Sequence, residues 1–288
     1  MFNRPAVMEQ LIMAGADVHA DHEAALIEAA WSNSAKAAEM LFQHGAQINP
    51  SSRESHPLHH ACYDISPKTA IFLLNNNADP NALGRIGRVE GSPLMMALKT
   101  YNRWDGEWKH QIIEGLIEAG ANYRDDAMMA IHRGRVDLLQ QQLDANPELV
   151  HQRFEMPNDN TYCPLNGGTL LHLVAEYNEY PNALVNAKQL LARGADINAR
   201  TKKSVDGTDG HTPIFHLLRI WIQTSEKLLN FLIEQGADLT VKGTFMVNGE
   251  QLELTPLGFE LRRQPNPPYS GGPSQRVIEM LRANGVAE

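Results

Sequence analysis

The stretch Gly194-Ala195-Asp196-Ile197-Asn198-Ala199 decides the fold, because close variants of it recur along the whole chain. The other copies begin at Gly15, Gly45, Asn77, Gly120, Gly236 and Gly285. Each copy closes a stretch with helical character, such as residues 187–193, at the point where a helix needs a residue that tolerates positive φ. Recurrence at intervals of about 20–50 residues indicates a repeat array. We therefore expect stacked repeats.

A second phrase lies between these copies and reads Thr212-Pro213-Ile214-Phe215-His216 in one of its forms. Its other copies begin at Ala24, His56, Ser92, Asp126, Thr169 and Thr255. Thr or Ser can cap a helix, Pro suits the first turn, and the apolar residues that follow can pack against a second helix. The phrase resembles the Thr-Pro-Leu-His-x-Ala opening of the ankyrin repeat.

The seven openings, at positions 24, 56, 92, 126, 169, 212 and 255, are 32, 36, 34, 43, 43 and 43 residues apart. The ankyrin unit has about 33 residues, so the last three steps each carry about ten extra residues. The resemblance implies an all-α ankyrin-repeat solenoid of stacked helix-turn-helix units with short β-hairpin loops. We expect about seven repeats and an N-terminal half repeat, in a single domain over residues 1–288.

The register also predicts individual elements. The second helix of each repeat is expected to include residues 35–43, 67–74, 112–118, 136–143, 187–192, 227–234 and 275–282. Leucines of these helices should be buried between repeats, namely Leu73, Leu116, Leu139, Leu191 and Leu232. Glu260 stands where other repeats have Ala61, Ala97 or Leu217, so we expect it to face solvent on a terminal repeat with weak end units.

Several segments are longer than the repeat requires. Four insertions are expected in the turns between paired helices, at residues 101–110, 177–186, 221–225 and 263–274. Three more lengthen the loops between repeats, at residues 153–168, 200–210 and 242–254. In the last of these, Asn248-Gly249 between alternating residues predicts a β-hairpin with a two-residue turn. Insertions in solenoids often lie on the binding face, although surface loops also drift without function.

Composition excludes several function classes. The net charge is −9, and neither half of the chain is basic, so we expect no nucleic-acid partner. No segment approaches 18 apolar residues, and the start lacks an apolar leader, so we expect no membrane association. Cys62 and Cys163 form no metal-binding or redox motif, which fits a reducing compartment. We expect a cytoplasmic monomer.

One column of the repeat suggests a binding surface. The residues at or next to the end of each first helix run from aromatic to cationic, and such residues are enriched at interface hot spots. The predicted protein-binding residues are those of this column and of the adjacent turns, namely Trp31, Tyr63, Trp104, Trp108, Arg133, Tyr177, Arg219, Trp221 and Arg262. The alternative for Trp31 and Trp221 is that they cover the edge of the core.

The sequence contains few features that indicate catalysis or metal binding. His56 and His60 have a helical spacing that could hold zinc, but His59 is the histidine of the opening phrase. The resemblance implies that His59 hydrogen-bonds the backbone of a neighbouring repeat and that Cys62 faces the core. Phosphate-loop and nucleophile-elbow motifs are absent from the sequence. We expect no catalytic residue, cofactor or metal.

The resemblance implies that the chain binds a protein partner through the concave face of its first helices and its hairpin loops. One alternative is an inhibitor or immunity-type protein that blocks one enzyme with an inserted loop such as residues 242–254. Another is a hydrolase with acids contributed by the loops at residues 153–168 and 200–210. The sequence does not identify the partner.

Overall fold

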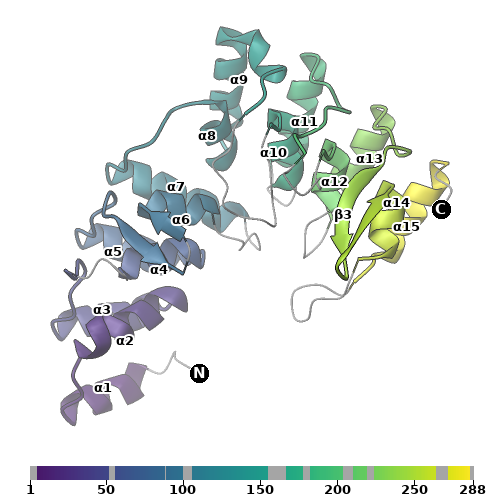
Figure 1. The fold of residues 1–288 in the computed structure, drawn as a ribbon. Helices are drawn as coiled ribbons and strands as arrows, with labels where there is room; N and C mark the ends of the chain where they lie inside the picture. The colour runs from purple at the N-terminus through teal and green to yellow at the C-terminus, as the bar shows by residue number, and fades with distance from the viewer. Residues whose placement is uncertain are drawn as a thin grey trace. The chain divides into compact units, whose positions relative to one another are not determined.

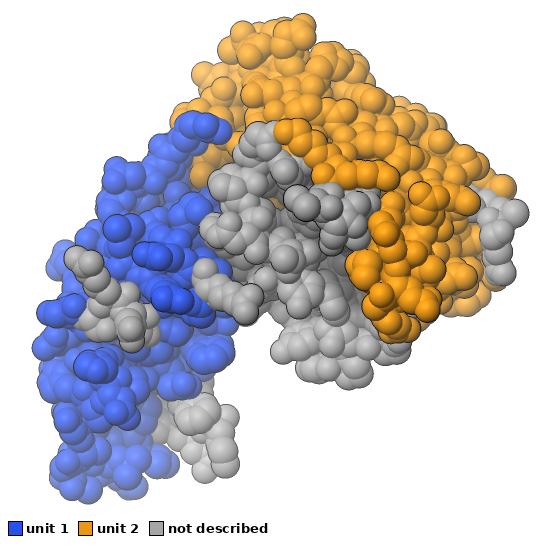
Figure 2. Space-filling model, viewed as in Figure 1, with its two compact units in different colours: residues 1–124 blue, residues 125–288 orange. Residues whose placement is uncertain are grey.

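The computed structural model describes residues 5–51, 56–87, 89–99, 106–154, 167–177, 182–203, 210–218, 224–263 and 272–285. The chain divides into two compact units, Met1–Arg124 and Asp125–Glu288, coloured separately in Figure 2. Both units are built from pairs of short helices (Figure 1). The expected single domain over residues 1–288 stays a prediction, and each unit is described by itself.

In the first unit, a lone helix precedes the pairs. The elements are α1 (Pro5–Met13), α2 (Ala20–Trp31), α3 (Ala35–Gln43), α4 (Pro57–Tyr63), α5 (Pro67–Asn75), β1 (Gly84–Ile86), β2 (Val89–Gly91), α6 (Pro93–Lys99) and α7 (Gly106–Glu118). Helix α2 packs on α3, α4 on α5, and α6 on α7. The first helices α2, α4 and α6 pack in succession, as do the second helices α1, α3, α5 and α7. Two rows of helices result.

The second unit repeats this arrangement. Its elements are α8 (Ala127–His132), α9 (Val136–Ala145), the 3-10 helix η1 (Pro147–Val150), α10 (Leu170–Glu176), α11 (Ala183–Ala192), α12 (Pro213–Leu218), α13 (Glu226–Glu234), β3 (Gly243–Val247), β4 (Glu250–Leu254), α14 (Pro256–Leu261) and α15 (Gln275–Ala283). The first helices α8, α10, α12 and α14 form one row, and the second helices α9, α11 and α13 pack in order beside it. Helix α15 packs on α14. The solenoid architecture expected from the sequence is confirmed.

The second helices contain the predicted ranges, but two of them begin earlier than expected. Helix α7 begins at Gly106 rather than at residue 112, and α11 begins at Ala183 rather than at residue 187. Residues assigned to the insertions at 101–110 and 177–186 therefore lengthen the second helices. The physical reason is that extra residues before a helix can join its hydrogen-bonded ladder instead of forming a loop.

Helix ends follow the sequence signals. Asp126 accepts a hydrogen bond from Met129 N at 2.9 Å, which caps α8. The closing residues adopt a left-handed conformation, with φ of 86° at Gly194 and 64° at Asn77. Asn tolerates this region better than other residues with a side chain. The copy of the closing phrase that begins with Asn77 therefore ends its helix as the glycine copies do.

The hairpin predicted around Asn248-Gly249 is confirmed. Strands β3 and β4 pair antiparallel, with Val247 opposite Glu250, so two residues form the turn. Their φ values are 53° at Asn248 and 85° at Gly249, the two positive angles of a type I′ turn. The shorter β1–β2 hairpin is one of the short hairpin loops expected between repeats, but its position was not predicted, because the sequence there has no Asn-Gly pair.

The core consists of leucines and alanines between neighbouring helices. Leu73, Leu116 and Leu139 are fully buried and Leu232 is 1% exposed, as predicted. The prediction was wrong at Leu191, which is only partly buried, whereas Leu190 is 0% exposed. Leu73, Leu116 and Leu232 each lie four residues before the closing Gly or Asn, and the same spacing before Gly194 selects Leu190.

Glu260 contradicts the expected solvent-facing position, because its side chain is 0% exposed. Its Oε1 accepts a hydrogen bond from Ser274 N at 2.6 Å, and its Oε2 pairs with Arg263 Nη1 at 3.2 Å. Burial raises the pKa of Glu260, and the bonds from Ser274 and Arg263 oppose that rise. The carboxylate thus joins the two ends of the long connection between α14 and α15. Arg263 and Ser274 thus contact a side chain that we expected to face solvent.

Candidate functional site

The exposed aromatic side chain of Trp31 is the clearest surface feature of the first unit. Trp31 is the last residue of α2 and is 54% exposed. Its ring lies 6.1 Å from that of His60 on α4, measured between centroids. Because α2 and α4 are neighbouring first helices, the two rings form a patch at the ends of that row.

Two half-buried residues continue this patch at the end of α4. Tyr63 is the last residue of that helix, and Asp64 follows as its C-cap. Burial raises the pKa of the Asp64 carboxyl to about 6, and a hydrogen bond from the Trp31 side chain opposes the rise. Burial also lowers the pKa of His60. We name Trp31, His60, Tyr63 and Asp64 the tryptophan patch. It offers aromatic faces, a hydroxyl and a partly desolvated carboxyl group.

The residues predicted to bind a partner do not all lie at the end of a first helix, as Trp31 and Tyr63 do. Trp108 is 41% exposed, but it lies in the first turns of α7, a second helix. In the second unit, Arg133 at the end of α8 is half-buried, and Arg262 at the end of α14 is exposed. Arg262 Nη1 donates a hydrogen bond to Gly258 O at 3.3 Å. The predicted residues Trp104, Arg219 and Trp221 lie outside the described residues.

Tyr177 requires a correction, because we expected a partly exposed side chain and it is 5% exposed. Its ring lies edge-on to His132 with 5.0 Å between centroids. Tyr177 directly follows α10, and His132 is the last residue of the neighbouring first helix α8. The tyrosine therefore packs between adjacent repeats, where it stabilises the fold and is not available to a partner.

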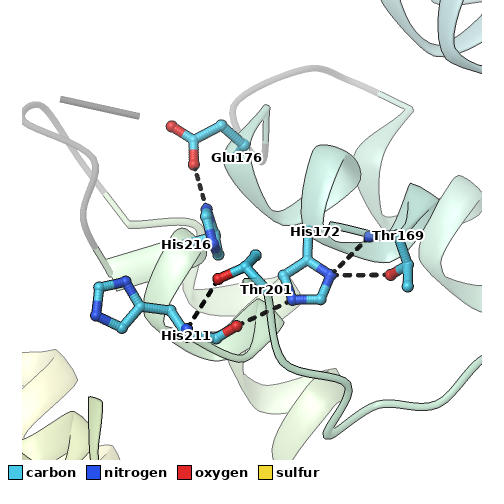
Figure 3. Close-up of polar contacts among 6 residues, drawn as sticks. All are labelled: Thr169, His172, Glu176, Thr201, His211 and His216. Carbon is cyan, nitrogen blue, oxygen red and sulfur yellow. Dashed lines mark hydrogen bonds and ion pairs between the residues drawn. The ribbon is translucent and has the colours of Figure 1, made fainter. Parts of the chain in front are cut away.

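A buried histidine, His172, links α10 to the next repeat (Figure 3). Its Nδ1 accepts hydrogen bonds from Thr169 N at 3.1 Å and Thr169 Oγ1 at 2.9 Å, and its Nε2 donates to His211 O at 3.1 Å. The N–H of His211 in turn donates to Thr201 Oγ1 at 3.0 Å. Each ring nitrogen thus has a fixed role, and the neutral tautomer with a proton on Nε2 fits both.

His211 passes the same link to the last hairpin. Its Nε2 donates to Thr244 O at 3.0 Å on β3, and its ring stacks on Phe245 with 4.2 Å between centroids. The opening phrase did not reveal His211, because this histidine lies just before Thr212, outside the phrase. At the fourth position of the phrase, where other repeats have His59 or His172, this repeat has Phe215. A histidine that directly precedes the phrase is the signal that could have found it.

A second buried contact joins the first helices α10 and α12. His216 Nδ1 donates to Glu176 Oε2 at 2.8 Å, and the two side chains are 0% and 1% exposed (Figure 3). Glu176 is the last residue of α10, as Trp31 is of α2, but its side chain is buried. No described residue hydrogen-bonds His216 Nε2. The pair ties neighbouring repeats together across the row of first helices.

His59 has the equivalent role in the first unit, as the resemblance implied. Its Nε2 lies 3.1 Å from both Ala82 O and Gly91 O, which flank the β1–β2 hairpin. Burial, the largest effect, lowers the pKa of His59 to about 4. Cys62 is buried and unbonded to another cysteine. Within the described part of the chain, no three His, Cys, Asp or Glu side chains gather as metal ligands would.

Comparison with known proteins finds ankyrin repeats in two parts of the chain. A model described as ankyrin repeats in three copies matches residues 1–84, and a single ankyrin repeat model matches residues 166–202. No curated protein matches the chain. The crystal structure of the human ASB11 ankyrin repeat domain is similar, with 20% identity, a TM-score of 0.41, and coverage of 91% of this chain and 98% of that one. The two family matches agree with the repeat phrases and the helix pairs. The chain therefore contains ankyrin repeats within residues 1–84 and 166–202.

Ankyrin repeats are generally protein–protein interaction modules and typically serve as non-enzymatic scaffolds. None of the described helices has the length and apolar character needed to span a membrane. The loops of the alternative hydrolase, at residues 153–168 and 200–210, lie largely outside the described residues. The cytoplasmic location and the monomeric state stay predictions.

Proposed function

We propose that this chain binds a partner protein through the ends of its first helices and through its hairpin loops. The exposure of Trp31 carries the proposal, because 54% of this large side chain is open to solvent at the end of α2. When a partner covers an exposed tryptophan, the burial of its apolar surface stabilises the complex. Tryptophan is also enriched among the residues that dominate binding. The tryptophan patch supplies polar groups beside this anchor.

The chemistry of the partner follows from the residues at the same repeat position. In the first unit these are Trp31 and Tyr63, and in the second unit Arg133 and Arg262. Aromatic residues favour an apolar surface, and arginine favours carboxylates. A partner with an apolar patch and acidic groups fits both kinds of residue.

The alternative function, an inhibitor that blocks one enzyme, is supported by the β3–β4 hairpin. Its strands have five residues each and a two-residue turn, and Met246 on β3 is 55% exposed. A paired hairpin loses little conformational entropy on entering a cleft, which favours tight binding. Removal of the turn residues Asn248-Gly249 should abolish inhibition if this alternative holds, but not the binding that depends on Trp31.

The test compares a patch variant with a matched surface variant. Trp31→Ala should weaken binding to a partner isolated by affinity capture by about 2 kcal/mol or more in calorimetry. Phe42→Ala on α3 is the control, because Phe42 is also an exposed aromatic residue, 39% exposed, but lies on a second helix. Both variants should remain folded, which far-ultraviolet circular dichroism at the temperature of the binding measurement checks. Equal affinities for the parent and Trp31→Ala would refute the proposal.

A further inference from the structure

The lone helix α1 has an apolar face that its own unit leaves open. Val7 is 46% exposed and Leu11 is 57% exposed. Together with side chains of α2 and α3, these residues line a cavity of about 440 Å³. Lining residues include Val7, Leu11, Ala25, Glu28, Ala37 and Leu41. We name this cavity the α1 groove.

The repeat register shows what normally covers this face. Val7 and Leu11 stand eight and four residues before the closing Gly15. Residues at these two positions in other second helices are at most 2% exposed, namely Ala37 and Leu41, Ile112 and Leu116, Leu228 and Leu232, and Val277 and Leu281. The same two positions are therefore buried in four other repeats and open in α1.

A first helix packs on the second helix of each of those repeats. Helix α2 packs on α3, α6 on α7, α12 on α13, and α14 on α15. Helix α1 packs on α3, but the described residues contain no helix that pairs with α1 as α2 pairs with α3. The α1 groove thus has the position of a first helix. An α-helix with a stripe of leucine and alanine, like those of the first helices in this chain, fits it.

The charges along the groove indicate the polar flank of that helix. Two of the lining residues carry charge, Asp17 and Glu28, and both are acidic. A helix whose apolar stripe is bordered by lysine or arginine would place cations near these carboxylates. The attraction between them would raise the rate at which the helix associates with the groove and would make the binding more specific. Helix-in-groove recognition generally depends on such an amphipathic pattern.

We propose that the α1 groove binds an amphipathic α-helix of a partner protein, which takes the position of a first helix and directs basic side chains at Asp17 and Glu28. This inference rests on the proposed protein-binding function, but it concerns a surface other than the tryptophan patch. The occupant extends the row of first helices by one member, so the interface continues the packing of α2 on α4.

Two synthetic peptides test the proposal directly. The first has the sequence of residues 20–34, which includes all of α2, and carries a covalent staple across exposed positions because short isolated helices are marginal. The second carries Asp21→Lys and Glu28→Lys in the same peptide. Fluorescence anisotropy with the full chain should show binding of the lysine peptide at least about fivefold tighter than that of the acidic peptide, with a smaller ratio at high salt.

Paired variants on α1 locate the binding. Leu11→Gln in the full chain should weaken lysine-peptide binding at least about tenfold, because the apolar contact is lost. Met13→Gln is the matched control, since Met13 lies on the same helix, is 80% exposed and does not line the groove. It should change affinity by less than about twofold. Both variants should keep the parent's unfolding midpoint, because both residues are already exposed.

Three outcomes overturn the proposal. These are failure of both peptides to bind, equal losses from Leu11→Gln and Met13→Gln, and self-association of the chain in sedimentation experiments that Leu11→Gln abolishes. The last result would identify a second copy as the occupant. Trp31→Ala should leave peptide binding intact. Absence of peptide binding together with loss of the captured partner in Trp31→Ala would refute the groove alone and leave the proposed function standing.

Discussion

Protonation of His172 should couple the stability of the second unit to pH. Burial is the main reason why the pKa of His172 falls from 6.5 to about 3 in the folded chain. The geometry gives the same direction, because Nδ1 already accepts hydrogen bonds from Thr169 and cannot take a proton without losing them. In the unfolded chain the ring is free to bind a proton near its ordinary pKa.

The sign and size follow from linkage between folding and proton binding. At pH values below about 6.5 the unfolded state binds a proton that the folded state excludes, so stability decreases as pH falls and levels off only near the folded pKa of about 3. Integration from about pH 7 to about pH 5 gives a loss of about 2 kcal/mol from His172. Above about pH 7 the His172 ring is unprotonated in both the folded and the unfolded state, so it adds no pH dependence to the stability there.

Urea unfolding followed by far-ultraviolet circular dichroism measures this loss in the parent chain and in His172→Gln. The variant should be less stable near neutral pH by about 1–3 kcal/mol, because hydrogen bonds are lost. Its further loss on acidification should be smaller than the parent's by about 2 kcal/mol. The raised pKa of Glu260 makes acidification stabilising. Both proteins contain Glu260, so its contribution cancels when the loss in the variant is subtracted from the loss in the parent.

His151→Gln serves as the control, because it removes an exposed histidine of the same unit. Equal losses in the parent and in His172→Gln would refute the reasoning. The histidine would then titrate alike in the folded and unfolded states, or its site would open before it takes up the proton.

Two further predictions concern buried positions of the second unit. Leu190→Ala should lower the free energy of unfolding by about 2–5 kcal/mol and Leu191→Ala by less than about 2 kcal/mol, and equal losses in urea unfolding would contradict the corrected register. Glu260→Ala should cost about 2–4 kcal/mol because the Ser274 N–H loses its acceptor, whereas Glu260→Gln keeps an acceptor oxygen and should cost about 1 kcal/mol. A thermal unfolding midpoint for Glu260→Ala as high as that of Glu260→Gln would show that the hydrogen bond from Ser274 N to residue 260 contributes nothing to stability.

The sequence predicted features that depend on local chemistry. Gly194 ends a helix because it adopts positive φ, and Asn77 can substitute for glycine at such a position for the same reason. Asn248-Gly249 specified its turn through the same backbone requirement. These conformations are set by one or two residues, so a short phrase is enough to identify them.

Features that depend on the length of a connection could not be predicted in this way. Whether Glu260 faces solvent depends on where the two ends of the long connection lie, and Ser274 N donates to the carboxylate at 2.6 Å. Tyr177 follows α10 and packs against His132 of the preceding repeat, a contact that the repeat position alone does not specify. Leu190 was the exception, because counting back four residues from Gly194 identifies it.

The exposure of the candidate binding residues was the hardest feature to predict, and the histidine contacts explain why. His59 and His172 hold their own first helices, α4 and α10, to the backbone of the loop that follows, through carbonyl groups that every residue supplies. Side chains at the ends of the first helices are then free to vary without loss of that contact. Trp31 can remain exposed while Tyr177, at nearly the same repeat position, is buried. A fold held in this way constrains the sequence where repeats meet and leaves the partner-facing residues to be set by the partner.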